Sequence, residues 1–228
     1  METAFPIAQP LQLGCKARIS LIVGGVMSEA DAVAAATAGA QAVAILLGGK
    51  GVSLQQAVDI AAAAWEAGAE TVGVFDAETA PTIIEWASLI GLSAVVLLGG
   101  VKEALPILDA DLPPDIVCIL GQRVDLQGQP VDKGIVGMVR QGDWILVDGM
   151  VPAMDQWANW NKLIAPRGPW ILGGGLTPTR VAEAIQRWSP QGIYFNLRMG
   201  GEKRKLSTLA QVEALVNMIA DLSLSEST

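Results

Sequence analysis

The chain has 228 residues, of which 51% are hydrophobic and 17% are charged. This composition excludes an intrinsically disordered protein, and the length suits one well-buried domain. The net charge of −8 argues against binding to nucleic acid or to anionic lipid, because both partners favour a basic protein surface.

The sequence contains no histidine and only two cysteines, Cys15 and Cys118. We therefore expect neither a metal site nor a disulfide framework, and no motif indicates a cofactor. Isolated cysteines favour a reducing compartment, so we expect a cytoplasmic protein. The first residues lack the basic and apolar regions of a signal peptide.

One uncharged stretch of 18 residues, Ala32 to Gly49, has the length of a short membrane span. It is interrupted by Thr37, Gly39 and Gln41 and ends in a pair of glycines. These residues favour an Ala-rich helix, a glycine stop and a buried strand, so we expect no membrane insertion.

Short apolar runs alternate with longer helical stretches along the whole chain. Predicted strands span residues 17–23, 41–47, 70–75, 93–98, 115–120, 144–148, 170–172 and 193–197. Predicted helices span residues 28–38, 53–67, 77–90, 101–108, 135–141, 154–163, 177–188 and 207–222, and residues 121–133 are expected to be irregular. Ser28 and Thr177 are expected N-caps, and Gly39, Gly68 and Gly91 are expected to end helices.

The predicted strands are continuous apolar runs, which are typical of a parallel sheet covered by helices on its faces. Eight strand–helix units in one chain of this length predict a single-domain (β/α)₈ TIM barrel over residues 17–228, with an open doubly wound sheet as the alternative. Residues 1–16 form an apolar lead-in segment that we expect to cover the bottom of the barrel. Trp144, Trp157, Trp160 and Trp170 favour core packing or a subunit contact, and the chain is expected to be a monomer or a homodimer.

In a TIM barrel the active site lies at the C-terminal ends of the strands, where two features of this chain stand out. The glycines Gly173, Gly174 and Gly175 lead from a strand into a helix with Pro178 at its first position, an arrangement whose amides can bind phosphate. Asp148 ends an apolar strand, where burial raises the pKa of a carboxyl group and suits it to general acid or base catalysis. The alternative for the three glycines is a turn without a ligand, and the alternative for Asp148 is a carboxylate with a structural role.

Further polar residues follow the last predicted strand. Asn196 and Arg198 come directly after it, and Lys203, Arg204 and Lys205 extend a basic cluster in an otherwise acidic chain. This cluster either adds positive charge to a phosphate site or forms a solvated loop. The single tyrosine, Tyr194, either points into the barrel or away from it.

Several segments match a pattern known from one enzyme family. They are residues 29–32, 39–43, 72–75, 145–148, 159–160 and 172–178, followed by Val181, Ala184 and Ile185. The Gly-Gly-Leu-Thr-Pro run in the last segment is the most specific. In these segments the chain resembles phosphoribosylanthranilate isomerase, a TIM-barrel enzyme of tryptophan biosynthesis, over residues 18–220.

The resemblance implies an Amadori rearrangement of a phosphoribosyl amine, with a cysteine at the end of the first strand as general base. It assigns the general acid to Asp148 and phosphate binding to Gly173, Gly174 and Gly175. The cysteine position of the family falls at Gly24 in this chain, or at Val23 if the register slips by one residue.

Other family residues are also replaced. The arginine after the second strand is absent, with only Lys50 nearby, and the second phosphate loop reads Asn196, Leu197 and Arg198. Cys15 lies before the first strand and is expected near the opposite end of the barrel.

Three functions fit the sequence. The first is a degenerate or repurposed family member that binds a phosphorylated or anionic small molecule. The second is an active isomerase with Asp148 as the acid and another residue, such as Asp76, as the base. The third is a non-enzymatic scaffold whose apolar surface contacts a partner. Because Gly24 cannot accept a proton, we expect negligible isomerase activity.

Overall fold

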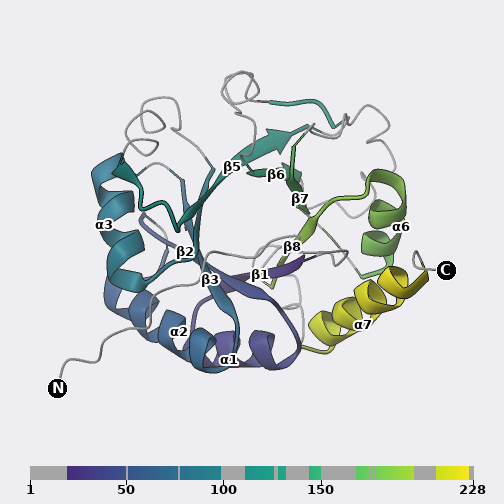
Figure 1. Cartoon of the computed structure of the whole chain (residues 1–228), viewed down its shortest axis with the longest axis horizontal. Coiled ribbons are helices and arrows are strands. Elements are labelled where there is room, and N and C mark those ends of the chain that lie inside the picture. The colour runs from purple at the N-terminus through teal and green to yellow at the C-terminus, as the bar shows by residue number, and fades with distance from the viewer. Residues whose placement is uncertain are drawn as a thin grey trace.

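The computed structural model describes residues 20–49, 51–76, 78–98, 111–125, 128–131, 144–149, 168–174, 176, 178–197 and 209–225. Within these residues, eight parallel strands form a closed barrel in which the last strand pairs with the first. Figure 1 looks along the barrel and shows the described helices around its outside. The predicted (β/α)₈ TIM barrel is confirmed, and the open doubly wound sheet is excluded.

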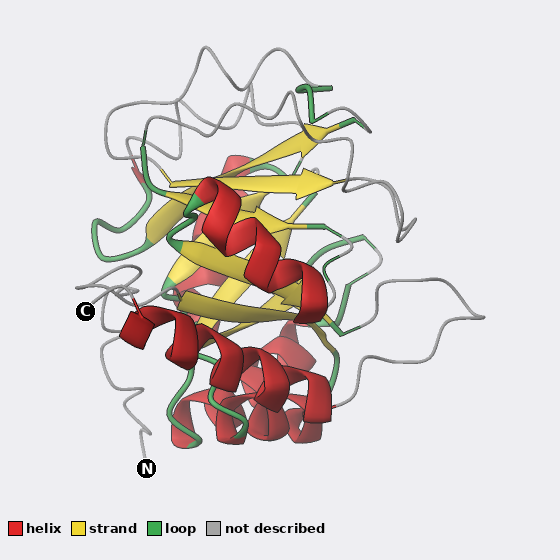
Figure 2. Ribbon diagram, turned by 90° about the vertical axis from the view of Figure 1, so that its right-hand side faces the viewer, coloured by secondary structure: helices red, strands yellow, loops and turns green. Residues whose placement is uncertain are grey.

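The strands follow one another around the barrel in chain order. They are β1 (Ser20–Val26), β2 (Ala42–Leu46), β3 (Glu70–Phe75), β4 (Ala94–Leu97), β5 (Val117–Val124), β6 (Trp144–Gly149), β7 (Trp170–Gly173) and β8 (Gly192–Asn196). The helices in the described residues are α1 (Glu29–Thr37), α2 (Leu54–Glu66), α3 (Ala80–Ile90), α6 (Pro178–Trp188) and α7 (Leu209–Ser225). Figure 2 shows these helices outside the strands from the side.

The helix ends follow the local signals of the sequence. Ser28 caps α1 by accepting a hydrogen bond from the Asp31 backbone N–H at 3.1 Å. Gly39 follows the C-cap with a φ of 100°, and Gly91 caps α3 with a φ of 74°, left-handed values that glycine adopts without steric cost. Helix α6 begins at Pro178 as predicted.

The longest departure from the predicted elements lies in β5. The sequence predicts a strand that ends at residue 120, but β5 continues through four more residues to Val124. These residues pair in parallel register with β6, where Arg123 lies opposite Asp148. The backbone hydrogen bonds of the closed barrel therefore override the polar character of the segment and carry Arg123 to the end of the sheet.

Two smaller corrections concern the ends of other elements. Strand β1 extends to Val26 rather than stopping at residue 23, because Gly24 still pairs with Asn196 of β8. Helix α3 begins at Ala80 rather than at residue 77, with Thr79 as N-cap and Pro81 in the first turn, where its missing N–H costs nothing.

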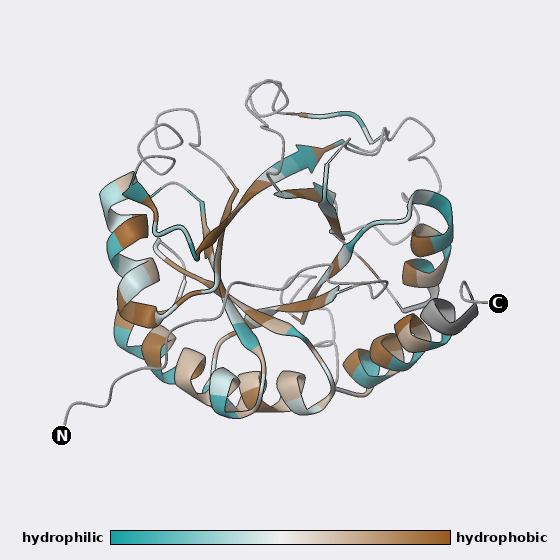
Figure 3. Ribbon diagram, in the orientation of Figure 1, coloured by the Kyte–Doolittle hydropathy of each residue, from teal (hydrophilic) through white to brown (hydrophobic). Residues whose placement is uncertain are grey.

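Apolar side chains form two layers, one inside the barrel and one between strands and helices. The interior layer contains Ile22, Val74, Val96, Ile119 and Leu146 together with the small residues of β2 and β4. The outer layer is larger and buries the alternate strand residues against the helices. Figure 3 colours the hydrophobic residues of the strands and helices brown. Side-chain alternation along each strand therefore decides which residues reach the interior.

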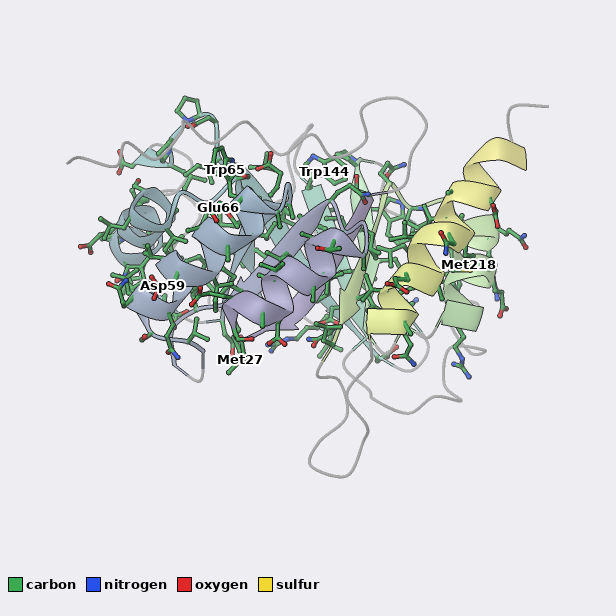
Figure 4. All side chains as sticks on the ribbon, turned by 90° about the horizontal axis from the view of Figure 1, so that it is seen from below. Met27, Asp59, Trp65, Glu66, Trp144 and Met218 are labelled. Carbon is green, nitrogen blue, oxygen red and sulfur yellow. The ribbon has the colours of Figure 1, made fainter. Side chains whose placement is uncertain are left out.

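Large exposed apolar side chains of the described residues are scattered. Met27 and Trp65 are 40% and 52% exposed and lie at opposite ends of the barrel in Figure 4.

No described helix combines the length and the apolar character needed to cross a bilayer, and the uncharged stretch from Ala32 contains the end of α1 followed by β2. Trp144 packs in the interior layer and Trp170 in the outer one.

Some predicted features lie outside the described residues. They are the lead-in segment 1–16, the helices expected at 101–108, 135–141 and 154–163, the N-cap Thr177, and the basic cluster at 198–205. Cys15 and Lys50 also fall outside this part of the chain.

Candidate functional site at the barrel mouth

The candidate site is the inner face of the barrel at the C-terminal ends of the strands, which we call the mouth. Alternation along β6 places Leu146 in the interior layer and Val147 in the outer one, so Asp148 returns to the inner face. The same alternation places Gly24, Arg123 and Tyr194 on this face.

Asp148 is a largely buried carboxyl group at the end of β6. A Cβ atom at Gly174 would lie 2.6 Å from Asp148 Oδ1, and Gly174 has a φ of 84°, so this close approach requires glycine. Burial raises the pKa of Asp148 from its ordinary 3.8 to about 6, and the positive charge of Arg123 opposes part of this rise. The carboxyl group can therefore exchange a proton near neutral pH.

Arg123 connects β5 to β3 across the end of β4. Its Nη2 donates to Oδ1 of Asp76 at 2.9 Å. The Asp76 side chain is 63% exposed, so this carboxylate is an ion-pair partner at the outer rim of the mouth. The alternative general base considered from the sequence thus lies beside a cation in contact with solvent.

The place of a side chain at position 24 is occupied by Tyr194. A Cβ atom built on Gly24 would lie 2.5 Å from Tyr194 Cζ and would overlap the hydroxyl oxygen. In the pairing of β1 with β8, Tyr194 is opposite Ile22, two residues before Gly24, so its ring extends towards the mouth. Burial raises the pKa of Tyr194 above its ordinary 10, and the neighbouring Asp148 raises it further, which keeps the phenol neutral.

The expected phosphate-binding residues are only partly within the described chain. Gly173 ends β7, Gly174 follows it, and α6 begins at Pro178. Asn196 ends β8, where the next residue, Leu197, donates its backbone N–H to the Gly24 carbonyl at 2.9 Å. Gly175 and Arg198 lie outside the described residues.

Curated proteins similar to this chain share one activity. An N-(5'-phosphoribosyl)anthranilate isomerase of Deinococcus radiodurans is 30% identical over 189 residues, which cover 77% of this chain and 85% of the relative. The chain belongs to the N-(5'-phosphoribosyl)anthranilate isomerase family. The chloroplastic isomerase 1 of Arabidopsis thaliana is 32% identical over 177 residues, covering 74% of this chain, which spans 63% of that relative's length. No family model matches the chain.

Solved structures of the isomerase family share the fold. TrpF from Jonesia denitrificans has a TM-score of 0.68 at 19% identity, covering 90% of this chain and 98% of its own. The isomerase of Pyrococcus furiosus has a TM-score of 0.66 at 16% identity, and the match covers 89% of this chain and 99% of the Pyrococcus chain. A further isomerase structure, in complex with reduced 1-(o-carboxyphenylamino)-1-deoxyribulose 5-phosphate, has a TM-score of 0.64 at 20% identity. The match covers 89% of this chain and 99% of that isomerase chain.

Two residues of the mouth have roles that the sequence alone does not assign. The sequence patterns leave the direction of Tyr194 open, although Tyr194 lies two residues before Asn196 and therefore shares its face of the strand. Arg123 comes shortly after the predicted fifth strand in a segment that the sequence predicts to be irregular, and the register of β5 against β6 brings it beside Asp148. Alternation along β8 is enough to decide the direction of Tyr194, whereas the pairing of Arg123 with Asp148 depends on the contact between two strands.

The charge of Arg123 predicts a measurable effect on Asp148. We expect the substitution Arg123→Met to move the pKa of Asp148 upward from about 6, because the guanidinium that favours the ionised carboxylate is lost. A pH titration of the Asp148 carboxyl carbon by NMR measures it. Arg187→Met, which removes a cation stacked on Trp188 in α6, is the control and should leave the titration unchanged. An unchanged or lower pKa in Arg123→Met would contradict the assignment.

Proposed function

We propose that this member of the isomerase family binds a phosphorylated or otherwise anionic small molecule at the barrel mouth and does not catalyse ordinary isomerase turnover. The single observation that carries the proposal is the filling of the side-chain space at Gly24 by Tyr194. The resemblance to the family assigns the general base to this position, and glycine has no group that accepts a proton.

The other groups at the mouth do not replace that base. The isomerisation needs one group to remove a proton from carbon and another to donate a proton to the ring oxygen, at the same pH. Asp148 can serve one of these roles. Tyr194 stays protonated because its pKa is raised, and Asp76 is held in the ion pair with Arg123.

Binding of an anion is supported by different features. Gly174 precedes the start of α6, and the N-terminal end of a helix favours negative charge through its first-turn backbone N–H groups and the helix dipole. Arg123 adds a cation on the inner face. The ligand in one similar isomerase structure carries a phosphate and a carboxylate, which are the groups that such features attract.

Titration with inorganic phosphate tests the proposed anion site. In ¹⁵N-labelled protein, the Gly174 amide resonance should shift in a saturable manner, because the anion accepts hydrogen bonds from this end of the barrel. The amide of Gly91, which caps α3, serves as the internal control. A Gly174 resonance that stays in place at saturating phosphate would show that the anion site is wrong.

An active isomerase that uses a different base is the second candidate. The observation in its favour is the pKa of Asp148 near 6, since most of this carboxyl group is ionised above neutral pH. Asp148 would then act as the base rather than the acid, and the proton for the ring oxygen would have to come from another group. A turnover measurement distinguishes the two candidates.

A further inference from the structure

Two polar groups, the Tyr194 hydroxyl and the Asp148 carboxylate, lie together at the mouth. Within the described part of the chain, no hydrogen bond joins the Tyr194 hydroxyl or the Asp148 carboxylate to another residue, although the charge of Asp148 acts on the Tyr194 hydroxyl. Both side chains are half-buried at the mouth, so their polar atoms are not sealed inside the protein. A hydroxyl donor and a carboxylate acceptor that are left unpaired side by side are groups available to a ligand.

The space for the Tyr194 hydroxyl is provided by Gly24 on one neighbouring strand, while Gly173 on the other neighbouring strand lies at ordinary contact distance from Tyr194. On β1, any side chain at Gly24 would collide with the phenol, and on β7 a Cβ atom at Gly173 would lie 3.4 Å from Tyr194 Cβ. Gly24 has no left-handed φ, so its backbone would accept any residue. The ring of Tyr194, rather than backbone geometry, therefore excludes a side chain from position 24.

We propose that the Tyr194 hydroxyl takes the place of a β1 side chain in the site and donates a hydrogen bond to an oxygen of the bound ligand, with the Asp148 carboxylate as the neighbouring acceptor. This inference rests on the proposed function, because it assigns a residue to the same anionic ligand. The anionic group lies towards Gly174, and the oxygen that meets Tyr194 belongs to the remainder of the ligand. Tyr194 is thus a specificity-determining residue supplied by β8.

The chain contains one tyrosine, so a ¹³Cζ-tyrosine label gives a single resonance that reports on this hydroxyl. Ribose 5-phosphate and inorganic phosphate are the probes. We expect ribose 5-phosphate to shift the Tyr194 resonance. The substitution Tyr194→Phe should weaken binding of ribose 5-phosphate by about 3–10-fold, the effect of one neutral hydrogen bond, and should leave phosphate binding at Gly174 unchanged.

Thr71→Val is the matched control for loss of a hydroxyl. Thr71 lies near the start of β3, at the opposite end of the barrel, where its hydroxyl donates to the Gly91 carbonyl at 3.2 Å. This variant should bind both probes as the unmodified protein does. If Tyr194→Phe binds ribose 5-phosphate equally well and the labelled resonance does not move, the inference is wrong while phosphate binding still supports the proposed function. Absence of binding by both probes would remove the proposed function and this inference with it.

A second experiment tests whether the Tyr194 ring excludes a side chain from position 24. Gly24→Ala should lower the midpoint of thermal unfolding by about 2–12 °C, because overpacking forces the Tyr194 ring to move. In a Tyr194→Val background, Gly24→Ala should leave the midpoint of thermal unfolding unchanged, because the ring is absent and the backbone at position 24 tolerates an alanine. Equal effects of Gly24→Ala in both backgrounds would show that Tyr194 does not hold the β1 position.

Discussion

Purified protein should convert phosphoribosylanthranilate at about 10⁻³–10⁻¹ s⁻¹. This range follows from a median enzyme turnover of about 10 s⁻¹ and a loss of about 10²–10⁴-fold when one acid or base group is missing. Gly24 has no side chain, and Tyr194, which fills its place, remains protonated. The decrease of anthranilate-type fluorescence during turnover measures the rate.

The single variant Gly24→Cys should remain equally slow, because the introduced Cβ atom meets the Tyr194 ring before the thiol reaches substrate. It serves as the matched control for the argument about position 24. A kcat of about 1–10³ s⁻¹ for the unmodified protein would contradict the prediction and support the candidate in which Asp148 is the base.

Replacing the buried carboxyl group should stabilise the fold at neutral and alkaline pH. Asp148 has a pKa of about 6 in the folded chain against 3.8 when unperturbed, so the folded state binds its proton more tightly. Stability therefore falls as the pH rises from about 4 to about 6, and the loss, about 3 kcal/mol, persists above that range. Asp148→Asn, which is neutral at every pH, should recover up to about 3 kcal/mol at pH 8 and almost nothing near pH 4.

Thermal or denaturant unfolding of both proteins between pH 4 and pH 8 checks this dependence. Asp59→Asn is the control, because Asp59 is exposed on α2 and pairs with Gln55 within its own helix. Its effect should stay within about 0.5 kcal/mol at every pH. An Asp148→Asn variant that is less stable than the unmodified protein at pH 8 would show that the carboxylate is stabilised by partners rather than penalised by burial.

The sequence was sufficient for the architecture because the barrel is encoded locally. Apolar strand runs, the Ser28 cap and the helix-ending glycines each act within a few residues, and the strands pair in chain order. The inner-face position of Asp148 also follows from alternation along one strand. These features need no knowledge of distant contacts.

The environment of the mouth depends on contacts between strands and was less accessible from sequence. Arg123 reaches Asp148 only through the register of β5 against β6, and Tyr194 fills position 24 only because β8 lies beside β1. The length of the Tyr194 side chain on β8 decides whether the space beside Gly24 is empty or filled. The absence of a thiol at position 24 is visible in the sequence, whereas the presence of Tyr194 in that space is visible only in the structure.

The pairing of β1 with β8 also has a consequence for folding. Gly24 and Tyr194 come from opposite ends of the described chain, and Ser20 to Gly24 pair with Gly192 to Asn196 only when the ring closes. Contacts between residues so distant in sequence form late, because the entropy of loop closure opposes them. Before that step, β1 and β8 are unpaired strand edges of the kind that promote aggregation. Completion of the proposed ligand site and protection against misassembly therefore occur in the same event.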